Sequence, residues 1–536
     1  MASVLCVLLP VSAGCGKSQA AAPRMAPAGE GGVGAEPNTA GDGPVEGGTA
    51  GAVGEGGSSA GSSLPPGGSG EPAGGQGGAP SEVPAPTVLL RSVSISQTLE
   101  LPLMKGGVAV SVDDRPAPLI AGKRALVRVF VDFEAGFATR PLIGVLDVKS
   151  SKGTRTILSE RTLSKASTQD DLESTFTFNV DGADLATSSS YRVRVLEEDT
   201  TLLARFPGVD YEPLSASMLP AFELVVVPFI SNGLGPKTTE TELSALRNRL
   251  LALYPSSDVV VTLSDAVTLP YVVNGDGDGW DPALDHILEV RAAAKPADNV
   301  FYFGAMAPDT SYAKYCAGSC ILGYSYVADD YDVEARGSIG ITVFQDGSGV
   351  KDAWDTVAHE LGHAMGREHA PCGIDDPKDT DPDYPYDNGG MGTTYGYDFD
   401  LVRLIKPKAA RDVMSYCTPV WISDYTYSAL FERLDFIANE SFRALAFSPL
   451  QLFRVARIRR GGESAWQGER RRRAGSRPVS LDLLDAAQRR MGVIEGQLRP
   501  VDHGRGGQVF LPAEKLSQSG AASVDLRPLG GWILPL

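Results

Sequence analysis

The sequence predicts a multidomain protein in which an α/β (α+β) domain is flanked by an N-terminal β-sandwich and a small C-terminal β-rich domain. Three patterns in the 536 residues predict it. Apolar and polar residues alternate along residues 87–218, mixed strand and helix patterns cover 219–440, and short apolar runs return over 441–536. The remaining residues, 1–15 and 16–86, have compositions that do not predict a folded domain.

Residues 1–15 read M-A-S-V-L-C-V-L-L-P-V-S-A-G-C, which is typical of an export signal. The ending S-A-G-C resembles the signal of bacterial lipoproteins, which would make Cys15 the lipidated residue. Ordinary cleavage followed by secretion is the alternative. We therefore expect the protein outside the cell or on the bacterial cell surface, as an outer-membrane lipoprotein if Cys15 is lipidated, with the membrane contacted only through that anchor.

Residues 16–86 consist mainly of Gly, Ala, Pro, Ser and Glu. Such a segment cannot bury enough apolar surface to fold. As a flexible tether it would span roughly 40–50 Å. A lipid anchor followed by this spacer would hold the folded part away from a membrane.

The β-sandwich is predicted from alternation with a period of two. Val127, Val129 and Val131, for example, alternate with Arg128, Phe130 and Asp132. No set of residues with catalytic potential stands out within 87–218. The expected role is a spacer, chaperoning or substrate-binding module.

The α/β domain is predicted from buried strands and amphipathic helices. Expected strands cover 222–229, 258–263, 299–303 and 338–344, and Leu243, Leu246, Leu250 and Leu253 follow helical spacing. A second helix carries the apolar stripe Trp354, Val357, Leu361 and Met365, with Asp352 as its N-cap.

Charge is distributed unevenly along the chain. The net charge is −18, yet residues 441–536 contain 16 Arg and Lys against 8 Asp and Glu. The overall negative charge argues against nucleic acid as a partner. The run Arg470–Arg473 suggests either binding to an anionic glycan or surface, or an ordinary solvated turn.

The strongest chemical signal is His359–His369, H-E-L-G-H-A-M-G-R-E-H, which holds three of the five histidines. His359 and His363 share one helix face, and Gly366 allows the turn that would bring His369 round as a third zinc ligand. Glu360 then remains free to act as general base on a water at the open fourth position.

Several other readings of these residues must be considered. The zinc could be structural, the third ligand could be a downstream carboxylate such as Glu368, or cysteines could form a separate zinc site. The two remaining histidines, His286 and His503, are expected to be ordinary surface or hydrogen-bonded side chains.

The segment His359–His369 matches the HExxHxxGxxH signature of the metzincin zinc metallopeptidases, which it resembles at every fixed position. These enzymes also have a Met-turn, and Met414 lies 45 residues beyond His369 within D-V-M-S-Y. The resemblance implies zinc bound by the three histidines and Met414 as a hydrophobic floor beneath them. Tyr416 is placed as in astacins and serralysins, where the equivalent tyrosine helps bind the reacting carbonyl.

This resemblance implies a zinc metalloendopeptidase that hydrolyses extracellular proteins or glycoproteins. The tether and flanking β-domains look like those of secreted bacterial metzincins, including mucin-cleaving ones. The alternative is a catalytically inactive, zinc-containing surface binding protein. A monomer is expected.

Four cysteines remain after Cys6 and Cys15, an even number that suits disulfides in an oxidising compartment. Three pairings are open. If the Met-turn lies beneath the metal, as the resemblance implies, Cys372 and Cys417 lie close together, which favours Cys372–Cys417 and Cys316–Cys320.

Asn274–Asp285 reads N-G-D-G-D-G-W-D-P-A-L-D and approximates an EF-hand calcium loop. Pro282 and Asp285 depart from the usual pattern. A possible Ca²⁺ site is therefore weighed against an acidic, glycine-rich turn before a helix.

Overall fold

The computed structural model describes residues 88–197, 201–318, 320–349, 353–439, 450–473, 475, 477–503 and 506–536. The expectations for Cys15, for the export segment, for the tether and for Asp352 as a helix cap fall outside these residues. The described part is multidomain and mostly β, with few helices. No helix within it is long and apolar enough to cross a membrane.

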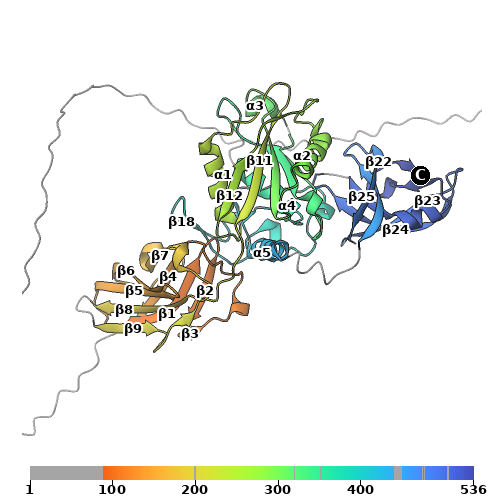
Figure 1. Ribbon diagram of the computed structural model, residues 1–536. Coiled ribbons are helices and arrows are strands. Elements are labelled where there is room, and N and C mark those ends of the chain that lie inside the picture. The colour runs from red at the N-terminus through yellow and green to blue at the C-terminus, as the bar shows by residue number, and fades with distance from the viewer. Residues whose placement is uncertain are drawn as a thin grey trace, which may run out of the picture. The chain divides into compact units, whose positions relative to one another are not determined.

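The N-terminal part contains two mainly antiparallel sheets (Figure 1). The first has the order β3 (Val108–Ala109), β2 (Glu100–Lys105), β1 (Val88–Ser96), β4 (Ala125–Phe133), β7 (Phe176–Val180). The second has the order β10 (Glu212–Pro213), β8 (Ser190–Glu197), β5 (Arg140–Ser150), β6 (Gly153–Leu163), with β9 (Leu202–Phe206) also paired to β8.

Strand β4 shows where the period-two pattern holds and where it fails. Val127, Val129 and Val131 are buried in the core, as the alternation predicts. Arg128, taken from the sequence as an outward polar residue, is also buried and forms an ion pair with Glu100 at 3.1 Å. The backbone carbonyl of Gln169 accepts a hydrogen bond from Arg128, so a loop covers this second face of the strand.

A six-stranded sheet forms the centre of the α/β part. Its order is β12 (Val259–Leu263), β11 (Phe222–Ile230), β14 (Val300–Met306), β16 (Gly337–Ile341), β15 (Gly323–Ser325), and β13 (Val267–Thr268) also pairs with β11. All pairings are parallel except that of β15 with β16. Strand β15 therefore lies at an edge and runs opposite to its neighbour.

Helices cover both faces of this sheet (Figure 1). On β14, Phe301 and Phe303 face the core shared with α1 (Glu240–Leu253) and α4 (Ala353–Ala364). Tyr302 and Met306 face the opposite core, shared with α2 (Trp280–Ala294). Because both faces of the strand are covered, it is apolar throughout rather than alternating.

Short elements follow the sheet. They are α3 (Tyr312–Tyr315) before β15, then β17 (Gly396–Asp398) paired with β18 (Arg403–Ile405), β19 (Arg411–Asp412) paired with β20 (Val420–Trp421), and α5 (Asp424–Ala438). The hydroxyl of Ser423 caps α5 by accepting a hydrogen bond from the backbone N–H of Thr426.

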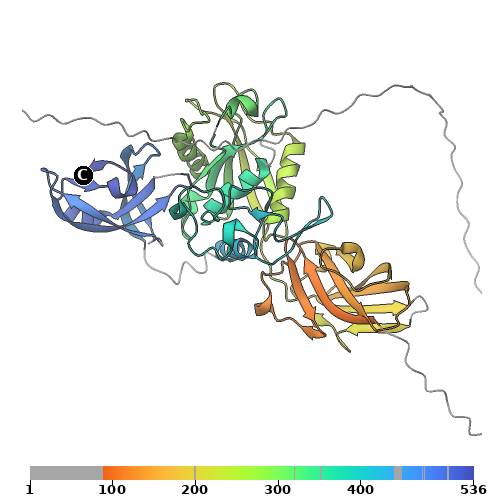
Figure 2. The same cartoon turned by 180° about the vertical axis from the view of Figure 1, so that it is seen from behind.

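The C-terminal part is a seven-stranded antiparallel sheet, seen from two sides in Figures 1 and 2. Its order is β22 (Ser464–Arg472), β21 (Gln451–Ile458), β25 (Gly507–Pro512), β24 (Arg490–Pro500), β23 (Pro478–Leu484), β26 (Ser523–Asp525), β27 (Ile533–Pro535), with α7 (Ala513–Gln518) after β25.

Buried arginines of this sheet pair with carboxylates of the α/β part. Arg499, only 1% exposed, contacts Asp332 at 2.6 Å and Glu334 at 2.7 Å. Arg472 reaches the same Asp332 at 2.6 Å. Neither sequence interpretation of the run Arg470–Arg473 fits Arg472, because that side chain points inward from a strand and is neutralised within the protein.

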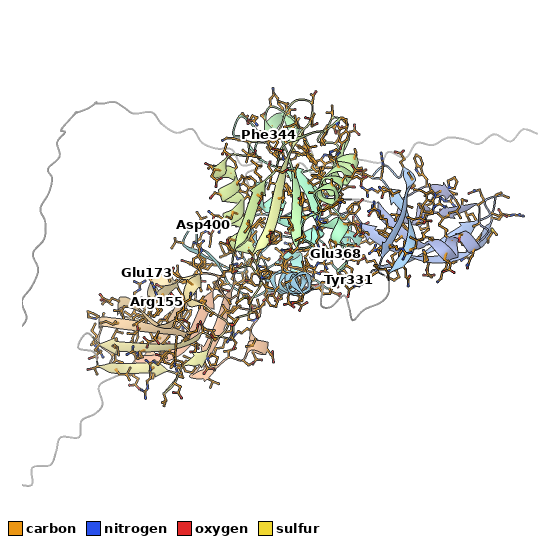
Figure 3. All side chains as sticks on the ribbon, in the orientation of Figure 1. Arg155, Glu173, Tyr331, Phe344, Glu368 and Asp400 are labelled. Carbon is orange, nitrogen blue, oxygen red and sulfur yellow. A yellow bond between two sulfur atoms is a disulfide. The ribbon has the colours of Figure 1, made fainter. Side chains whose placement is uncertain are left out.

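Two further contacts between the C-terminal part and the α/β part involve Tyr331 and Glu368, which are labelled in Figure 3. The guanidinium of Arg473 stacks over the ring of Tyr331 at 5.2 Å, and Arg477 pairs with Glu368 at 2.8 Å. The Arg-rich composition of residues 441–536 therefore serves, in part, contacts inside the molecule.

Candidate metal centre

Helix α4 presents two histidines on one face. Apolar residues at helical spacing, including Val357 and Leu361, bury the helix against the sheet. His359 and His363, four residues apart, project together, and their Nε2 atoms are 3.0 Å apart. Both side chains are buried, so the pair lies inside the α/β part rather than on its surface.

The chain reverses direction directly after α4. Gly366 has φ +85°, in the left-handed region where glycine is favoured, and an added Cβ would lie 2.8 Å from the carbonyl oxygen of Ala328. The reversal brings His369 back, and its Nε2 atom lies 3.1 Å from that of His363. The three histidines thus converge as the sequence predicts.

Backbone carbonyls orient all three rings. The Nδ1 atoms of His359, His363 and His369 lie 2.7, 2.5 and 3.0 Å from the carbonyl oxygens of Val413, Arg367 and Asp379, respectively. Each Nδ1–H can therefore donate to a carbonyl, which fixes the tautomer and leaves the Nε2 lone pair free.

Electrostatics keep these rings neutral. Burial lowers the pKa of His359 and His363 well below the usual value, and the neighbouring imidazoles lower each pKa further. Burial also lowers the pKa of His369. Three converging lone pairs at separations near 3 Å repel one another unless a cation lies between them, so this set of donors fits a divalent metal such as zinc.

Met414 lies beneath the two helical ligands. Its sulfur approaches α4 so closely that a Cβ added to Gly362 would be 2.4 Å from it, which explains a glycine inside the helix. Buried Asp412 holds the turn: its carboxylate accepts hydrogen bonds from the backbone N–H groups of Met414 and Ser423, each at 2.8 Å. Burial raises the pKa of Asp412 despite these bonds.

The structure contains the disulfide Cys372–Cys417, one of the two pairings that the sequence analysis favoured. Cys372 follows His369 by three residues and Cys417 follows Tyr416 directly. The backbone N–H of Tyr416 also donates to the carbonyl of Cys372 at 3.0 Å. The segment carrying the third histidine is therefore fastened to the Met-turn.

Glu360 lies beside the histidines and is buried. Burial raises the pKa of its carboxyl well above the usual range, and the charge of nearby Asp502 raises it further. Its Oε2 atom has no hydrogen-bond partner among the residues that the structure describes. A buried carboxylate oxygen without a partner is costly, so this atom is poised to interact with a water, a substrate or a cation.

Tyr416 joins the site through its hydroxyl, which is 3.0 Å from Nε2 of His369 and 2.7 Å from Nδ1 of His503. Burial raises the pKa of the Tyr416 hydroxyl, and the charges of Asp502 and Glu360 raise it further.

His503 is hydrogen-bonded, as one of the two expectations had it, and its partner is the Tyr416 hydroxyl; the structure also places its ring 5.9 Å from that of His369, beside the candidate metal centre. Asp502, which drew no attention in the sequence, lies there too. Both residues lie between β24 and β25, more than 130 positions beyond His369. Apart from the scarcity of histidine in the chain, no local pattern marks them. His286, by contrast, packs edge-on against Phe229 on α2.

A cleft of about 570 Å³ opens at the site. Its lining includes Leu322 and Gly323 beside the edge strand, His359, Glu360 and Tyr416. An edge strand offers unpaired backbone groups with which an extended peptide can form hydrogen bonds. The cleft thus brings the edge strand and the histidines together.

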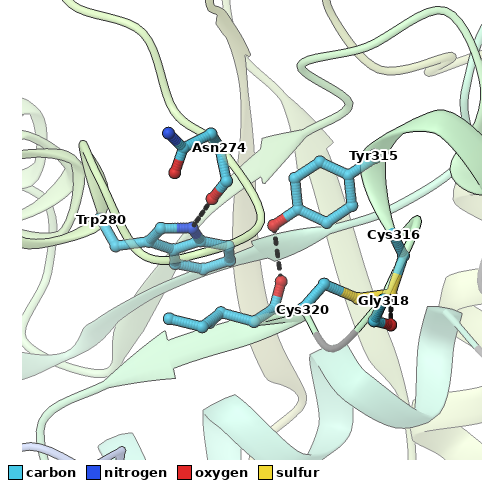
Figure 4. The surroundings of a disulfide bond; sticks show 7 residues. Asn274, Trp280, Tyr315, Cys316, Gly318 and Cys320 are labelled. Carbon is cyan, nitrogen blue, oxygen red and sulfur yellow. Dashed lines mark hydrogen bonds between the residues drawn. A yellow bond between two sulfur atoms is a disulfide. The ribbon is translucent and has the colours of Figure 1, made fainter.

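The second disulfide, Cys316–Cys320, closes a short loop (Figure 4), and Cys320 also lines this cleft. The Tyr315 hydroxyl donates to the carbonyl of Ile321, and the Trp280 indole N–H donates to the carbonyl of Asn274. The backbone N–H of Ile321 donates to the carbonyl of Gly275 at 3.0 Å, which fastens the loop to the segment that was considered as a calcium site.

That segment offers no cluster of acidic side chains that could hold an ion. Within the described residues, the two candidate groups are His359 with His363 and His369, and Glu360 with His363 and Asp502. Asp285, the last residue of the EF-hand-like pattern, lies on α2 and faces Arg457 at 3.7 Å. The turn preceding a helix is the interpretation that these contacts favour.

Two alternative ligand sets are also not assembled. Glu368 is directed to Arg477 rather than to the histidines. The four cysteines Cys316, Cys320, Cys372 and Cys417 form disulfides and so do not bind zinc.

Comparison with known proteins agrees with this chemistry. Residues 326–419 match the family model of peptidase M66, and this match supports a metallopeptidase. No curated protein shows significant similarity to the chain. Among solved structures, metalloproteinase-II from Bacteroides fragilis aligns with 11% identity over 59% of this chain and 85% of its own, with a TM-score of 0.23. A similarity that low adds nothing to the family match.

Proposed function

We propose that this chain is a zinc endopeptidase of the metzincin type, with His359, His363 and His369 as the metal ligands. One observation carries the proposal: three buried imidazoles converge with their Nε2 atoms 3.0 and 3.1 Å apart, and each ring is oriented by a backbone carbonyl. Three histidines with an additional open position are the ligand set of catalytic zinc. The match of residues 326–419 to a peptidase family supports the same conclusion.

Zinc, when bound, supplies Lewis-acid chemistry: it polarises the scissile carbonyl and lowers the pKa of water towards about 7. Glu360 accepts the proton of the attacking water and passes it to the leaving amine. Its buried position beside the histidines suits both steps, because a single carboxyl group can first accept a proton and then donate it. The Tyr416 hydroxyl, which keeps its proton, donates a hydrogen bond to the carbonyl oxygen as negative charge develops there.

The substrate is expected to bind as an extended chain. The backbone of the edge strand β15 and its preceding residues can hold a peptide through main-chain hydrogen bonds, which favour cleavage within a chain rather than at its ends. We propose extracellular proteins or glycoproteins as substrates. The sequence of residues 1–15, which is typical of an export signal and would make Cys15 a lipidation site, supports a proposed location at the cell surface or outside the cell.

The Glu360→Gln variant tests this function. Casein cleavage is expected to fall by about 10²–10⁴-fold, because the variant keeps the shape of the side chain but cannot accept a proton. Zinc content, measured by atomic absorption, should stay at one ion per chain. Glu432→Gln, on the exposed side of α5, serves as the matched control with wild-type activity.

Two results would contradict the proposal. The first is a Glu360→Gln protein that still cleaves casein at the wild-type rate. The second is a zinc-loaded wild-type protein, and equally loaded variants, that cleave nothing across a broad peptide library. That second result would favour the zinc-containing binding protein instead.

A further inference from the structure

The edge strand β15 has one side bonded to β16 and one side open to a further strand. The pairing with β16 is antiparallel, and next to it the backbone N–H of Ile341 donates to the carbonyl of Leu322 at 2.7 Å. In an antiparallel ladder, residues that bond to the neighbouring strand alternate with residues whose N–H and C=O point away from it. Leu322 therefore faces β16, whereas Ile321, Gly323 and Ser325 direct their backbone groups to the free edge.

After Gly323, this free edge is already paired with the turn between β24 and β25. The N–H of Ser325 donates to Oδ1 of Asp502 at 3.0 Å, and its carbonyl accepts a hydrogen bond from the N–H of Asp502 at 3.1 Å. Two residues further on, the N–H of Val327 donates to the carbonyl of Pro500 at 3.0 Å. A segment of the same chain thus occupies the place that a bound strand would take.

Before Gly323, the edge is closed by the loop of the Cys316–Cys320 disulfide. The N–H of Ile321 donates to the carbonyl of Gly275 at 3.0 Å. The carbonyl of Ile321 accepts a hydrogen bond from the Tyr315 hydroxyl at 2.6 Å (Figure 4). Both outward backbone groups of Ile321 are therefore satisfied within the protein.

Gly323 lies between these two closed ends. Neither its N–H nor its C=O has a hydrogen-bond partner among the residues that the structure describes. It lines the 570 Å³ cleft together with Glu360 and Tyr416. A Cβ added to Gly323 would overlap Oε1 of Glu360, so the carboxyl group lies directly against this glycine. The open backbone groups are therefore at the place where the proposed reaction occurs.

We infer that Gly323 is the one residue of the edge 321–327 whose backbone binds the substrate. In an antiparallel pair, Gly323 exchanges two hydrogen bonds with a single substrate residue. The substrate residues two positions to either side would meet Ile321 and Ser325, whose backbone groups are already bonded. The inference rests on the proposed function and narrows its substrate recognition: the peptide leaves the sheet edge on both sides of the paired residue.

This arrangement determines which peptides the cleft accepts. A peptide that adds a full strand to a sheet needs a backbone N–H at every second residue, and proline lacks one. A peptide that pairs at Gly323 alone needs one N–H, beside the bond to be cut. Segments with proline two residues from the paired residue therefore remain substrates.

The inference is tested by replacing backbone amides of a peptide with esters, one at a time, because an ester lacks the N–H donor. The peptide is the one from a fixed library that binds most tightly to the zinc-loaded Glu360→Gln protein. Titration calorimetry with this variant measures affinity without cleavage. The ester at the paired residue should weaken binding by about 10-fold. The next ester should weaken it less, because an ester carbonyl is the poorer acceptor, and the others by about 2-fold at most.

Other outcomes of the scan would overturn the inference. Losses of about 10-fold at two positions that lie two residues apart would show that the substrate pairs along the edge as a full strand. A scan without any loss would show that Gly323 does not bind the peptide backbone. Proline at the positions two residues from the sensitive one should leave affinity within about 2-fold, and losses of about 10-fold there would likewise contradict the inference.

The Tyr315→Phe variant, made in the Glu360→Gln protein, reopens one end of the edge. It removes the hydroxyl that Ile321 accepts, so its scan should gain a second sensitive ester, two residues beyond the first. Tyr312→Phe, in the same short helix, is the control and should keep the original scan. An unchanged scan in Tyr315→Phe would overturn the closure of the edge at Ile321.

Cleavage by the wild-type protein is measured separately with the same library. If the scan shows the single sensitive position but the zinc-loaded wild type cleaves no peptide, binding at Gly323 is supported and the peptidase function is contradicted. Cleavage together with losses at alternate positions would leave the function intact and reject the inference.

Discussion

At the scale of single residues, the metal centre shows which functions a local pattern can reveal. His359, Glu360, His363 and His369 lie within eleven positions, so helix geometry and one glycine turn suffice to bring them together. Asp502 could not be found in this way. Its place depends on hydrogen bonds to Ser325, which lies 177 positions earlier in the chain.

Gly362 gives a prediction at this scale. In an isolated helix, alanine would be more stable than glycine by about 1 kcal/mol. Here an added Cβ would be 2.4 Å from the sulfur of Met414, so we expect Gly362→Ala to lower the free energy of unfolding by about 1–3 kcal/mol. Urea denaturation measures this change. Gly208→Ala, with open space around the added carbon, should have little effect, and a stabilised Gly362→Ala would contradict the close contact.

At the scale of elements, strands and helices followed the sequence pattern closely where burial is regular. The leucines of α1 and the apolar run of β11 are examples. Side-chain direction was less predictable, as Arg128 and Arg472 show: both are charged, both are buried, and each meets a carboxylate from a distant segment. Periodicity indicates which face is covered by the core but not which face is covered by a loop or another sheet.

The two disulfides should differ in their effect on stability. A cross-link stabilises mainly by restricting the unfolded chain, and the effect grows with the length of the closed loop. Cys372–Cys417 spans 45 positions and Cys316–Cys320 spans 4. We expect paired Cys→Ser substitutions to cost about 4 and about 2 kcal/mol, respectively. Calorimetry of the two double variants checks the order, and equal losses would show that loop length does not decide the effect.

At the scale of the whole molecule, the parts are joined by buried polar contacts. Lys123 of the N-terminal part is 2% exposed, and its Nζ donates to Thr98 at 2.9 Å and to the carbonyl of Tyr254, in the α/β part, at 2.5 Å. Burial lowers the pKa of Lys123 to about 7, and neighbouring Arg124 contributes to the lowering.

This lysine gives a prediction for the pH dependence of stability. Its pKa is about 10.4 in the unfolded chain, so between pH 7 and 10 the unfolded state binds more protons than the folded state. Stability should therefore rise with pH across this window, by up to roughly 1.4 kcal/mol per unit. Below pH 7 both states are protonated and the rise ends.

Urea unfolding at pH 7 and pH 9 measures this contribution. The Lys123→Met variant should lose most of the rise in stability between the two values, whereas Lys105→Met, at an exposed position of β2, should keep it. A Lys123→Met protein with the same pH dependence as the wild type would show that the lysine stays charged in the folded protein.

The Cys372–Cys417 bond also determines what happens when the backbone is cut between the two cysteines. Residues 375–379, in this interval, are exposed. A single cut there leaves two polypeptides that remain covalently joined through the two sulfur atoms. Such nicked protein would migrate as one band on a denaturing, non-reducing gel and as two after a thiol is added, so a cut at this place escapes notice unless the sample is reduced.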